Sequence, residues 1–152
     1  MIRTLNEDEM YQVLSNNYIG YLAYIYRNRP FIKPITYFFQ KKNNIIISYS
    51  GNGHKVHAMR KHGEVALEVA EIDSVNNWKS VLAQGTYQEL SGSEAKAYLH
   101  DFSIGIKDLV IRKEGRTLDF ISDFSSKIYN NDDSPIVYII KIEEVSGRLR
   151  IH

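Results

Sequence analysis

The chain has 152 residues, 19 lysine and arginine residues against 18 acidic ones, and no cysteine. This length predicts a single domain, residues 1–152, that is large enough to form a substantial hydrophobic core. The balanced charge argues against a nucleic-acid partner, and the lack of cysteine excludes disulfides, thiolate catalysis and iron–sulfur clusters.

The first ten residues, MIRTLNEDEM, are polar and acidic, unlike the basic and apolar regions of a signal peptide. The chain also contains no apolar run long enough to cross a bilayer. We therefore expect a cytoplasmic protein that has no membrane partner.

The first half of the chain predicts one short helix and a series of strands. Asn6 is a good N-cap, and Glu9 three residues later completes a capping-box pattern before an apolar helical stripe. Pro34 indicates a sheet edge or a bulge, because proline cannot donate a ladder hydrogen bond. Segments rich in β-branched and aromatic residues, separated by short polar turns, predict an antiparallel meander of three strands, at residues 18–26, 31–39 and 45–49.

The second half of the chain predicts two more helices. One is expected over about 55–62 with Gly63 as its C-cap, and Ser93 is expected to cap another over about 94–102. Gly85 indicates a bend or bulge within a long strand. Residues 103–134 match no clear pattern beyond a short helical piece near 118–128. Alternating apolar residues predict three further strands, at 64–70, 78–90 and 136–145.

These segments together favour a closed sheet. There are six expected strands, with a helix between the third and the fourth, and full closure of a sheet removes its exposed edges. The predicted fold is therefore mainly β, a small six-stranded β-barrel with added helices.

The segment that follows the third strand is the best candidate for a ligand site. Gly51 and Gly53 allow close approach to the backbone, and the free N–H groups at a helix start favour an anion. Lys55 adds a mobile positive charge. Neither a P-loop nor a dinucleotide fingerprint is present, so a simple turn, a solvated Lys55 and an ordinary loop histidine at His54 are the alternatives. The order of elements nevertheless suits a phosphate-bearing ligand.

A series of short motifs extends this pattern over nearly the whole chain. They occupy residues 20–23, 29–37, 53–55, 59–60, 65–69, 78–81, 85 and 140–148. In this order they resemble the pyridoxamine 5′-phosphate oxidase-like, FMN-binding split-barrel family, and most of all its nitroimidazole-resistance-related branch. The resemblance implies a six-stranded split β-barrel.

The resemblance also implies a cofactor, a partner and site residues. The cofactor would be FMN, with FAD as an alternative, bound between the subunits of a homodimer that acts on an unknown small-molecule substrate. One segment, made of Pro34, Ile35, Thr36 and Tyr37, would run along the isoalloxazine ring. The phosphate and ribityl chain would be held by Ser50, Gly53, His54 and Lys55. The ring would lie near Glu68 and Val69, and the pocket would be closed by Trp78, Ser80 and Val81.

The chemistry at this site is less defined by the sequence. Many members of the nitroimidazole-resistance-related branch carry a histidine where this chain has Ser48, which predicts a poor nitroimidazole reductase because a serine is no comparable acid. No catalytic residue and no metal site can be assigned. Two functions remain open: a flavin-dependent oxidoreductase, and a non-catalytic sensor or storage protein that holds flavin or haem.

Overall fold

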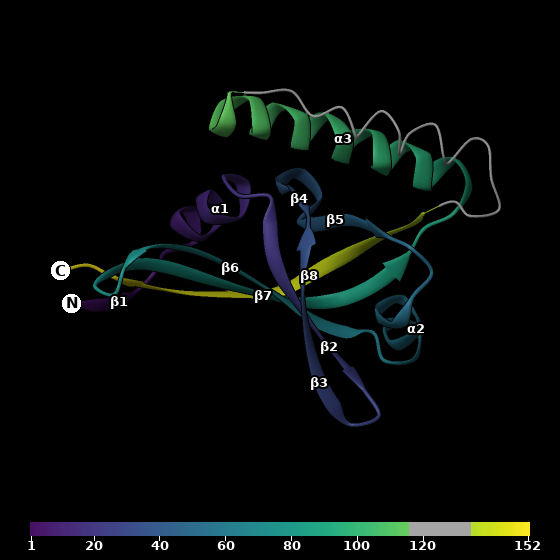
Figure 1. Ribbon diagram of the computed structural model, residues 1–152, viewed down its shortest axis with the longest axis horizontal. Coiled ribbons are helices and arrows are strands. Elements are labelled where there is room, and N and C mark those ends of the chain that lie inside the picture. The colour runs from purple at the N-terminus through teal and green to yellow at the C-terminus, as the bar shows by residue number, and fades with distance from the viewer. Residues whose placement is uncertain (116–134) are drawn as a thin grey trace.

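The computed structural model describes residues 1–115 and 135–152, which form one antiparallel sheet and three α-helices (Figure 1). The sheet has eight strands rather than the expected six, because the second predicted strand is interrupted at Tyr37 and a short strand precedes the first helix. The strands are β1 (Ile2–Thr4), β2 (Ile19–Tyr26), β3 (Arg29–Thr36), β4 (Phe38–Gln40), β5 (Ile45–Ser50), β6 (Glu64–Ser74), β7 (Asn77–Glu89) and β8 (Ile136–Arg150). The helices are α1 (Glu7–Ser15), α2 (His54–Lys61) and α3 (Gly92–Glu114), with a 3₁₀ turn at Lys41–Asn43.

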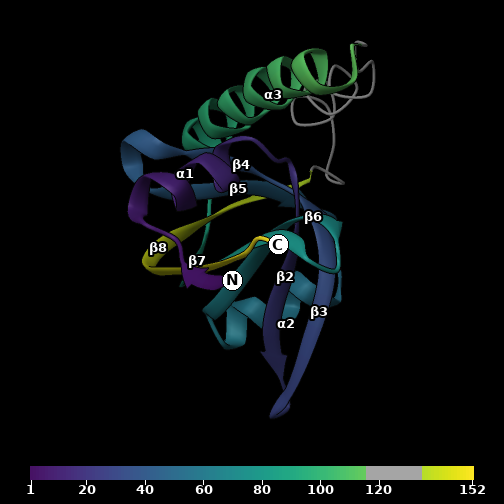
Figure 2. The same ribbon diagram turned by 90° about the vertical axis from the view of Figure 1, so that its left-hand side faces the viewer.

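The strands lie in the order β3-β2-β6-β7-β8-β5-β4, and β1 pairs with the C-terminal end of β8. The sheet is strongly coiled, as the two perpendicular views show (Figures 1 and 2). The hydroxyl of Ser48 on β5 donates a hydrogen bond to the carbonyl oxygen of Thr36 at the end of β3 (2.7 Å). This bond joins the two sides of the curled sheet. The prediction of a mainly β split barrel is thereby confirmed, with the strand count corrected.

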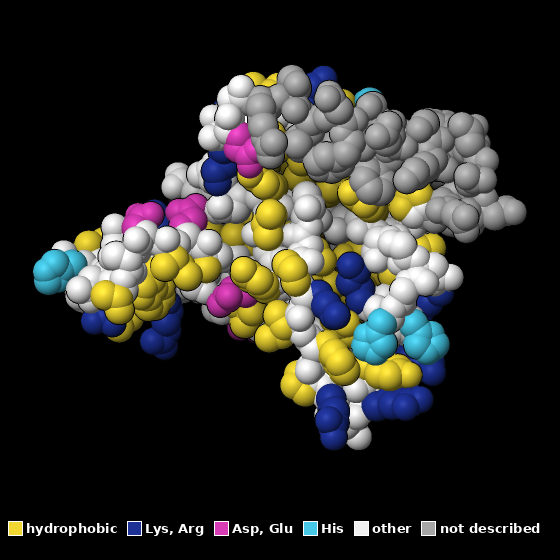
Figure 3. Space-filling model, in the orientation of Figure 1, with side chains coloured by type: hydrophobic (Ala, Val, Ile, Leu, Met, Phe, Trp, Pro, Cys, Tyr) yellow, Lys and Arg dark blue, Asp and Glu magenta, His cyan; other side chains and the backbone are white. Residues whose placement is uncertain are grey.

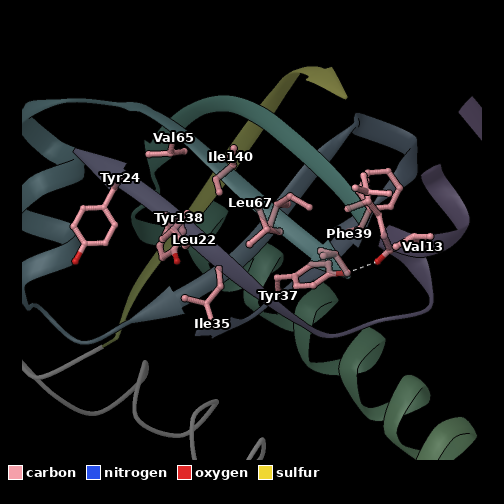
Figure 4. Close-up of a cluster of buried hydrophobic side chains, with 14 of the residues drawn as sticks. Val13, Leu22, Tyr24, Ile35, Tyr37, Phe39, Val65, Leu67, Tyr138 and Ile140 are labelled. Atoms are coloured by element: carbon pink, nitrogen blue, oxygen red, sulfur yellow. Dashed lines mark hydrogen bonds between the residues drawn. The ribbon is translucent and has the colours of Figure 1, made fainter. Parts of the chain in front are cut away.

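The barrel interior is filled by alternate side chains of the strands, since successive residues of a strand point to opposite faces. Tyr37 is fully buried, and its hydroxyl donates to the backbone carbonyl of Leu14 in the last turn of α1 (2.8 Å). Burial raises the pKa of this phenol. Tyr37 thus ends β3 by turning inwards and holds α1 on the barrel. Other fully buried members of this cluster are Leu22, Tyr24, Leu67, Tyr138 and Ile140 (Figure 4).

A second hydrophobic cluster lies between α3 and the outer face of β5 and β8. The helix is much longer than the predicted 94–102, since it begins at Gly92 after Ser91 and ends at Glu114 before the left-handed Gly115. Its glycine at position 105 lies against Phe38, where an added Cβ would come within 2.2 Å of the ring. The helical piece expected near 118–128 lies outside the described residues. No helix in the described part of the chain, α3 included, is long and apolar enough to cross a membrane.

Several local predictions are confirmed. Asn6 and Glu9 form the expected capping box, in which each side chain accepts a hydrogen bond from the backbone N–H of the other residue. Pro34 lies in β3, which is an edge strand. Helix α2 differs slightly from expectation, because it starts one residue earlier and its C-cap is His62 rather than Gly63. The N-cap of α3 is Ser91 rather than the predicted Ser93.

Gly85 lies at the predicted irregularity in β7. The register between β7 and β8 shifts between Gln84 and Gly85, as expected for a β-bulge. A Cβ added to Gly85 would lie 2.1 Å from the carbonyl oxygen of Lys141 on β8, a contact that no side chain tolerates without a backbone shift. Glycine at this position therefore permits the close approach of the two longest strands.

We predict that Gly85→Ala lowers the free energy of unfolding by about 1–3 kcal/mol or more, because the added methyl group forces β7 and β8 apart. Urea denaturation followed by circular dichroism measures the change. Gly51→Ala is the matched control: nothing lies within 4 Å of a Cβ at Gly51, so its effect should stay within about 0.5 kcal/mol. Equal stability of the two variants would contradict the prediction.

Candidate functional site

A cavity of about 390 Å³ opens where the β2–β3 hairpin meets the start of α2. Its lining includes the four residues predicted to hold a phosphate, together with Tyr24 and Lys33, which the sequence did not indicate. Figure 3 shows basic side chains and histidines gathered over this end of the molecule. The lining residues are Tyr24, Lys33, Ser50, Gly51, Asn52, Gly53, His54 and Lys55.

The loop between β5 and α2 presents bare backbone to this cavity. Gly53 is the N-cap of α2, and it provides no side-chain hydrogen bond to the N–H groups of the first turn. A Cβ at Gly51 or Gly53 would meet no atom within 4 Å, and neither glycine has a positive φ. Internal packing and backbone conformation thus give no reason for glycine here. Close approach of a ligand to the backbone does give one.

Two lysine side chains converge on the cavity from different elements. Lys55 lies in the first turn of α2 and is half-buried, and Lys33 projects from β3. Burial, and secondarily the charge of Lys33, lowers the pKa of the Lys55 amino group. Over residues 1–115 and 135–152 the ion pairs are Arg3–Glu9 and Arg60–Glu89, and neither involves these lysines. The cavity lining in the described chain also contains no acidic residue, so the cavity is suited to an anion.

His54 is held in place by aromatic rings. Its Nδ1 atom lies 3.1 Å from the hydroxyl oxygen of the buried Tyr24. Its ring centroid is 4.8 Å from that of Tyr26 and 5.0 Å from that of Phe31. The imidazole therefore has a fixed orientation at the edge of the cavity, and its exposed surface faces solvent.

A second group of predicted residues lies on the outer face of the sheet. Pro34 and Thr36 are on the outer face of the edge strand β3, and Glu68 is exposed on β6. The hydroxyl of Ser80 donates to the carboxylate of Glu68 (3.0 Å). Ser80 and the half-buried Trp78 also line a hollow of about 610 Å³ beside α1. These residues are brought together along one surface, separate from the cavity of the two lysines.

The remaining predicted residues point into the barrel. The side chains of Ile35, Tyr37, Val69 and Val81 are buried in its core. A ligand on the outer face could meet only their backbone. The reason is strand alternation: consecutive residues of a strand cannot all face one ligand, so Ile35 and Tyr37 are directed inwards where Pro34 and Thr36 face outwards.

Ser48 is also an interior residue. Only 1% of its surface is exposed, and its hydrogen bond to Thr36 is structural. The structure thus gives this serine a role in closing the barrel. Its predicted effect on nitroimidazole reduction stays a prediction. Within the described residues there is no group of three or more histidine or acidic side chains suited to a metal ion.

We predict that Lys33→Met raises the pKa of the Lys55 amino group, because it removes a nearby like charge while keeping the apolar side chain. The pKa of Lys55 is measured by NMR titration of protein labelled with ¹³C at the lysine ε carbon. Lys41→Met, which changes a lysine outside the cavity, is the control and should leave that pKa unchanged. An unchanged Lys55 pKa in Lys33→Met would show that the two amino groups do not share the cavity.

The chain is similar to known proteins in both sequence and structure. The family model described as pyridoxamine 5′-phosphate oxidase matches residues 6–149. An uncharacterized protein of Rhizobium meliloti (strain 1021) is 33% identical over 93 residues, which are 61% of this chain and 60% of that protein. An FAD-binding protein from Mesorhizobium loti has a similar structure, with a TM-score of 0.76 at 25% identity over 100% of this chain and 98% of the other.

A proposed 5-nitroimidazole antibiotic resistance protein from Bacteroides thetaiotaomicron shares the fold. Its TM-score is 0.67 at 10% identity, over 98% of this chain and 89% of the other. The family resemblance inferred from the ordered motifs is confirmed by the match over nearly the whole chain. This chain belongs to the pyridoxamine 5′-phosphate oxidase family.

Proposed function

We propose that this protein is a flavin-dependent oxidoreductase that holds the flavin phosphate in the cavity between β3 and α2. The observation that carries the proposal is the convergence of Lys33 and Lys55 on a cavity without an acidic lining residue. A phosphate monoester carries a charge of about −1.5 to −2 near neutral pH, which two lysines would balance. The structurally similar FAD-binding protein from Mesorhizobium loti supports a flavin as the ligand.

The isoalloxazine ring is assigned to the outer face of the sheet beside β3. This strand is at the sheet edge, where N–H and C=O groups are available to pair with the polar edge of a flavin. Pro34 and Thr36 supply side chains on that face, and the ribityl chain would connect the ring to the phosphate cavity. FMN ends at this phosphate, whereas FAD continues through a second phosphate to adenosine.

A second copy of the chain would cover the ring. Tyr21 and Ile32 lie on neighbouring strands of the outer face and are 48% and 67% exposed. Together with Ala23, Glu68 and Leu82 they line a largely apolar hollow of about 430 Å³. An exposed apolar patch of this kind marks an interaction site. We assign it to a homodimer interface, in agreement with the family resemblance.

The flavin would supply the electron transfer, and the chain would supply binding and surroundings. Lys33, Lys55 and the α2 N–H groups would fix the phosphate, and the apolar outer face would exclude water from the ring. A reduced nicotinamide is the proposed electron donor, and a small molecule of unassigned structure is the acceptor.

The ligand and the activity are tested on the protein as purified. We expect bound flavin, identified by mass spectrometry of the released ligand, and loss of its visible absorbance when NADH or NADPH is added without oxygen. A Soret band would identify haem instead and contradict the proposal. Bound flavin that neither nicotinamide reduces would contradict the oxidoreductase and favour a sensor or storage protein.

We predict that Lys55→Ala weakens flavin binding about tenfold to a hundredfold, as expected when a charge-assisted contact of roughly 1.5–3 kcal/mol is lost. Quenching of flavin fluorescence during titration of the flavin-free protein measures the Kd. Lys61→Ala is the matched control, because Lys61 lies at the other end of the same helix and outside the cavity. Similar flavin affinity in both variants would remove Lys55 from the site.

We predict that Ile32→Glu converts the dimer into a monomer, because it places a charge in the centre of the apolar outer face. Analytical ultracentrifugation at micromolar concentration measures the association. Ile111→Glu introduces the same change at an exposed position of α3, away from that face, and should leave the dimer intact. A wild-type protein that sediments as a monomer with flavin bound would refute the interface.

A further inference from the structure

We propose that Asn52 is a further phosphate-binding residue and that Arg60 positions it. The inference rests on the proposed flavin phosphate site and adds to it a donor that the sequence did not indicate. Asn52 lies in the loop between β5 and α2 and lines the cavity. Arg60 lies in the last turn of α2 and does not line the cavity, so we assign it an indirect role.

Arg60 is fixed by two short hydrogen bonds. Its Nε and Nη2 atoms donate to the two carboxylate oxygens of Glu89 at the end of β7, at 2.8 and 2.9 Å. The phenol of Tyr87, on the same strand, also donates to Glu89 (2.8 Å). The hydrogen bonds from Arg60, and secondarily the one from Tyr87, lower the pKa of the Glu89 carboxyl. A bidentate pair of this kind holds the plane of the guanidinium in one orientation.

The fixed guanidinium in turn orients the side-chain amide of Asn52. The Nη1 atom of Arg60, which Glu89 does not engage, donates a long hydrogen bond to Oδ1 of Asn52 (3.4 Å). A guanidinium has only donors, so the atom of the amide that faces it is the oxygen. The Nδ2 group of the planar amide is therefore directed away from Arg60. Within residues 1–115 and 135–152 this group makes no hydrogen bond.

This arrangement suits a phosphate oxygen. Asn52 offers amide N–H donors beside the N–H groups at the start of α2 and the amino groups of Lys33 and Lys55. The two lysines supply positive charge on flexible side chains, whereas the oriented amide supplies a donor of fixed direction. The hydrogen bonds thus connect β7, through Glu89 and Arg60, to the loop that lines the cavity.

The test compares FMN with riboflavin, which lacks the phosphate. Fluorescence titration of the flavin-free protein measures both Kd values. Asn52→Ala and Arg60→Met should each weaken FMN binding about tenfold, as expected when one hydrogen bond to a charged group is lost. Riboflavin binding and far-UV circular dichroism should stay unchanged, which shows that the variants are folded. The double variant should bind FMN no more weakly than Asn52→Ala alone, since both changes remove the same contact.

Glu89→Met separates a positioning role of Arg60 from a direct effect of its charge. The change removes a negative charge near an anion site, so electrostatics alone would tighten FMN binding. We expect weaker FMN binding instead, with riboflavin binding unchanged, because the guanidinium is no longer held. Tighter FMN binding in Glu89→Met, or full FMN affinity in Asn52→Ala, would overturn this inference and leave the proposed flavin site standing.

Arg3→Met is the matched control. Arg3 forms a bidentate pair of the same kind with Glu9, at 2.9 and 2.8 Å, but it lies on β1, far from α2 (Figure 1). Its replacement should leave FMN and riboflavin binding unchanged. A wild-type protein that binds FMN no more tightly than riboflavin would contradict the proposed phosphate site, and this inference with it.

Discussion

The pairing of β7 with β8 is the interaction on which the rest of this structure depends. The two strands run together from Trp78 opposite Arg150 to Glu89 opposite Tyr138. The other edge of β8 is divided, because its first half pairs with β5 and its last residues pair with β1. One strand thus joins both parts of the split barrel, and the bulge at Gly85 lets it follow the curvature.

The same arrangement assembles the candidate site. β5 is fixed on β8, and its C-terminal end leads into the glycine loop and α2. β3 is positioned from the opposite side of the sheet, through β2 and β6. Lys33 and Lys55 reach one cavity only because the curled sheet brings these two ends together. The hydrogen bond from Ser48 to Thr36 secures this meeting point from inside the barrel.

Much of the fold could be predicted from local sequence, because its signals are local. A capping box at Asn6, a proline in an edge strand and a glycine at a bulge each follow from the chemistry of one or two residues. The length of α3 could not be predicted in this way. Gly105 has a low helix propensity, so local sequence argues against a long helix there. Glycine is needed at this position because it leaves room for the ring of Phe38, a residue distant in sequence.

The part of the candidate site that is local in sequence could likewise be predicted. Ser50, Gly53, His54 and Lys55 are close in sequence, and the structure places them together. Lys33 and Tyr24 lie on other strands, so only the tertiary fold reveals that they share the cavity. Conversely, consecutive residues that match the family motifs do not all lie on one surface when they are in a strand, because their side chains alternate between the two faces of the sheet. Val69 and Val81 face the core for this reason, although their neighbours Glu68 and Ser80 face outwards.

The position of β8 also has a consequence for how the chain reaches this structure. β8 is the last strand in the sequence, yet it lies inside the sheet and pairs with β1, β5 and β7. During synthesis the earlier strands would emerge from the ribosome with no central strand to join their two groups. Closure of the barrel must await the synthesis of β8, and it must bring together segments far apart along the chain, which slows folding. Until then, the unpaired edges of β5 and β7 are the surfaces on which a growing chain would meet chaperones or misassemble.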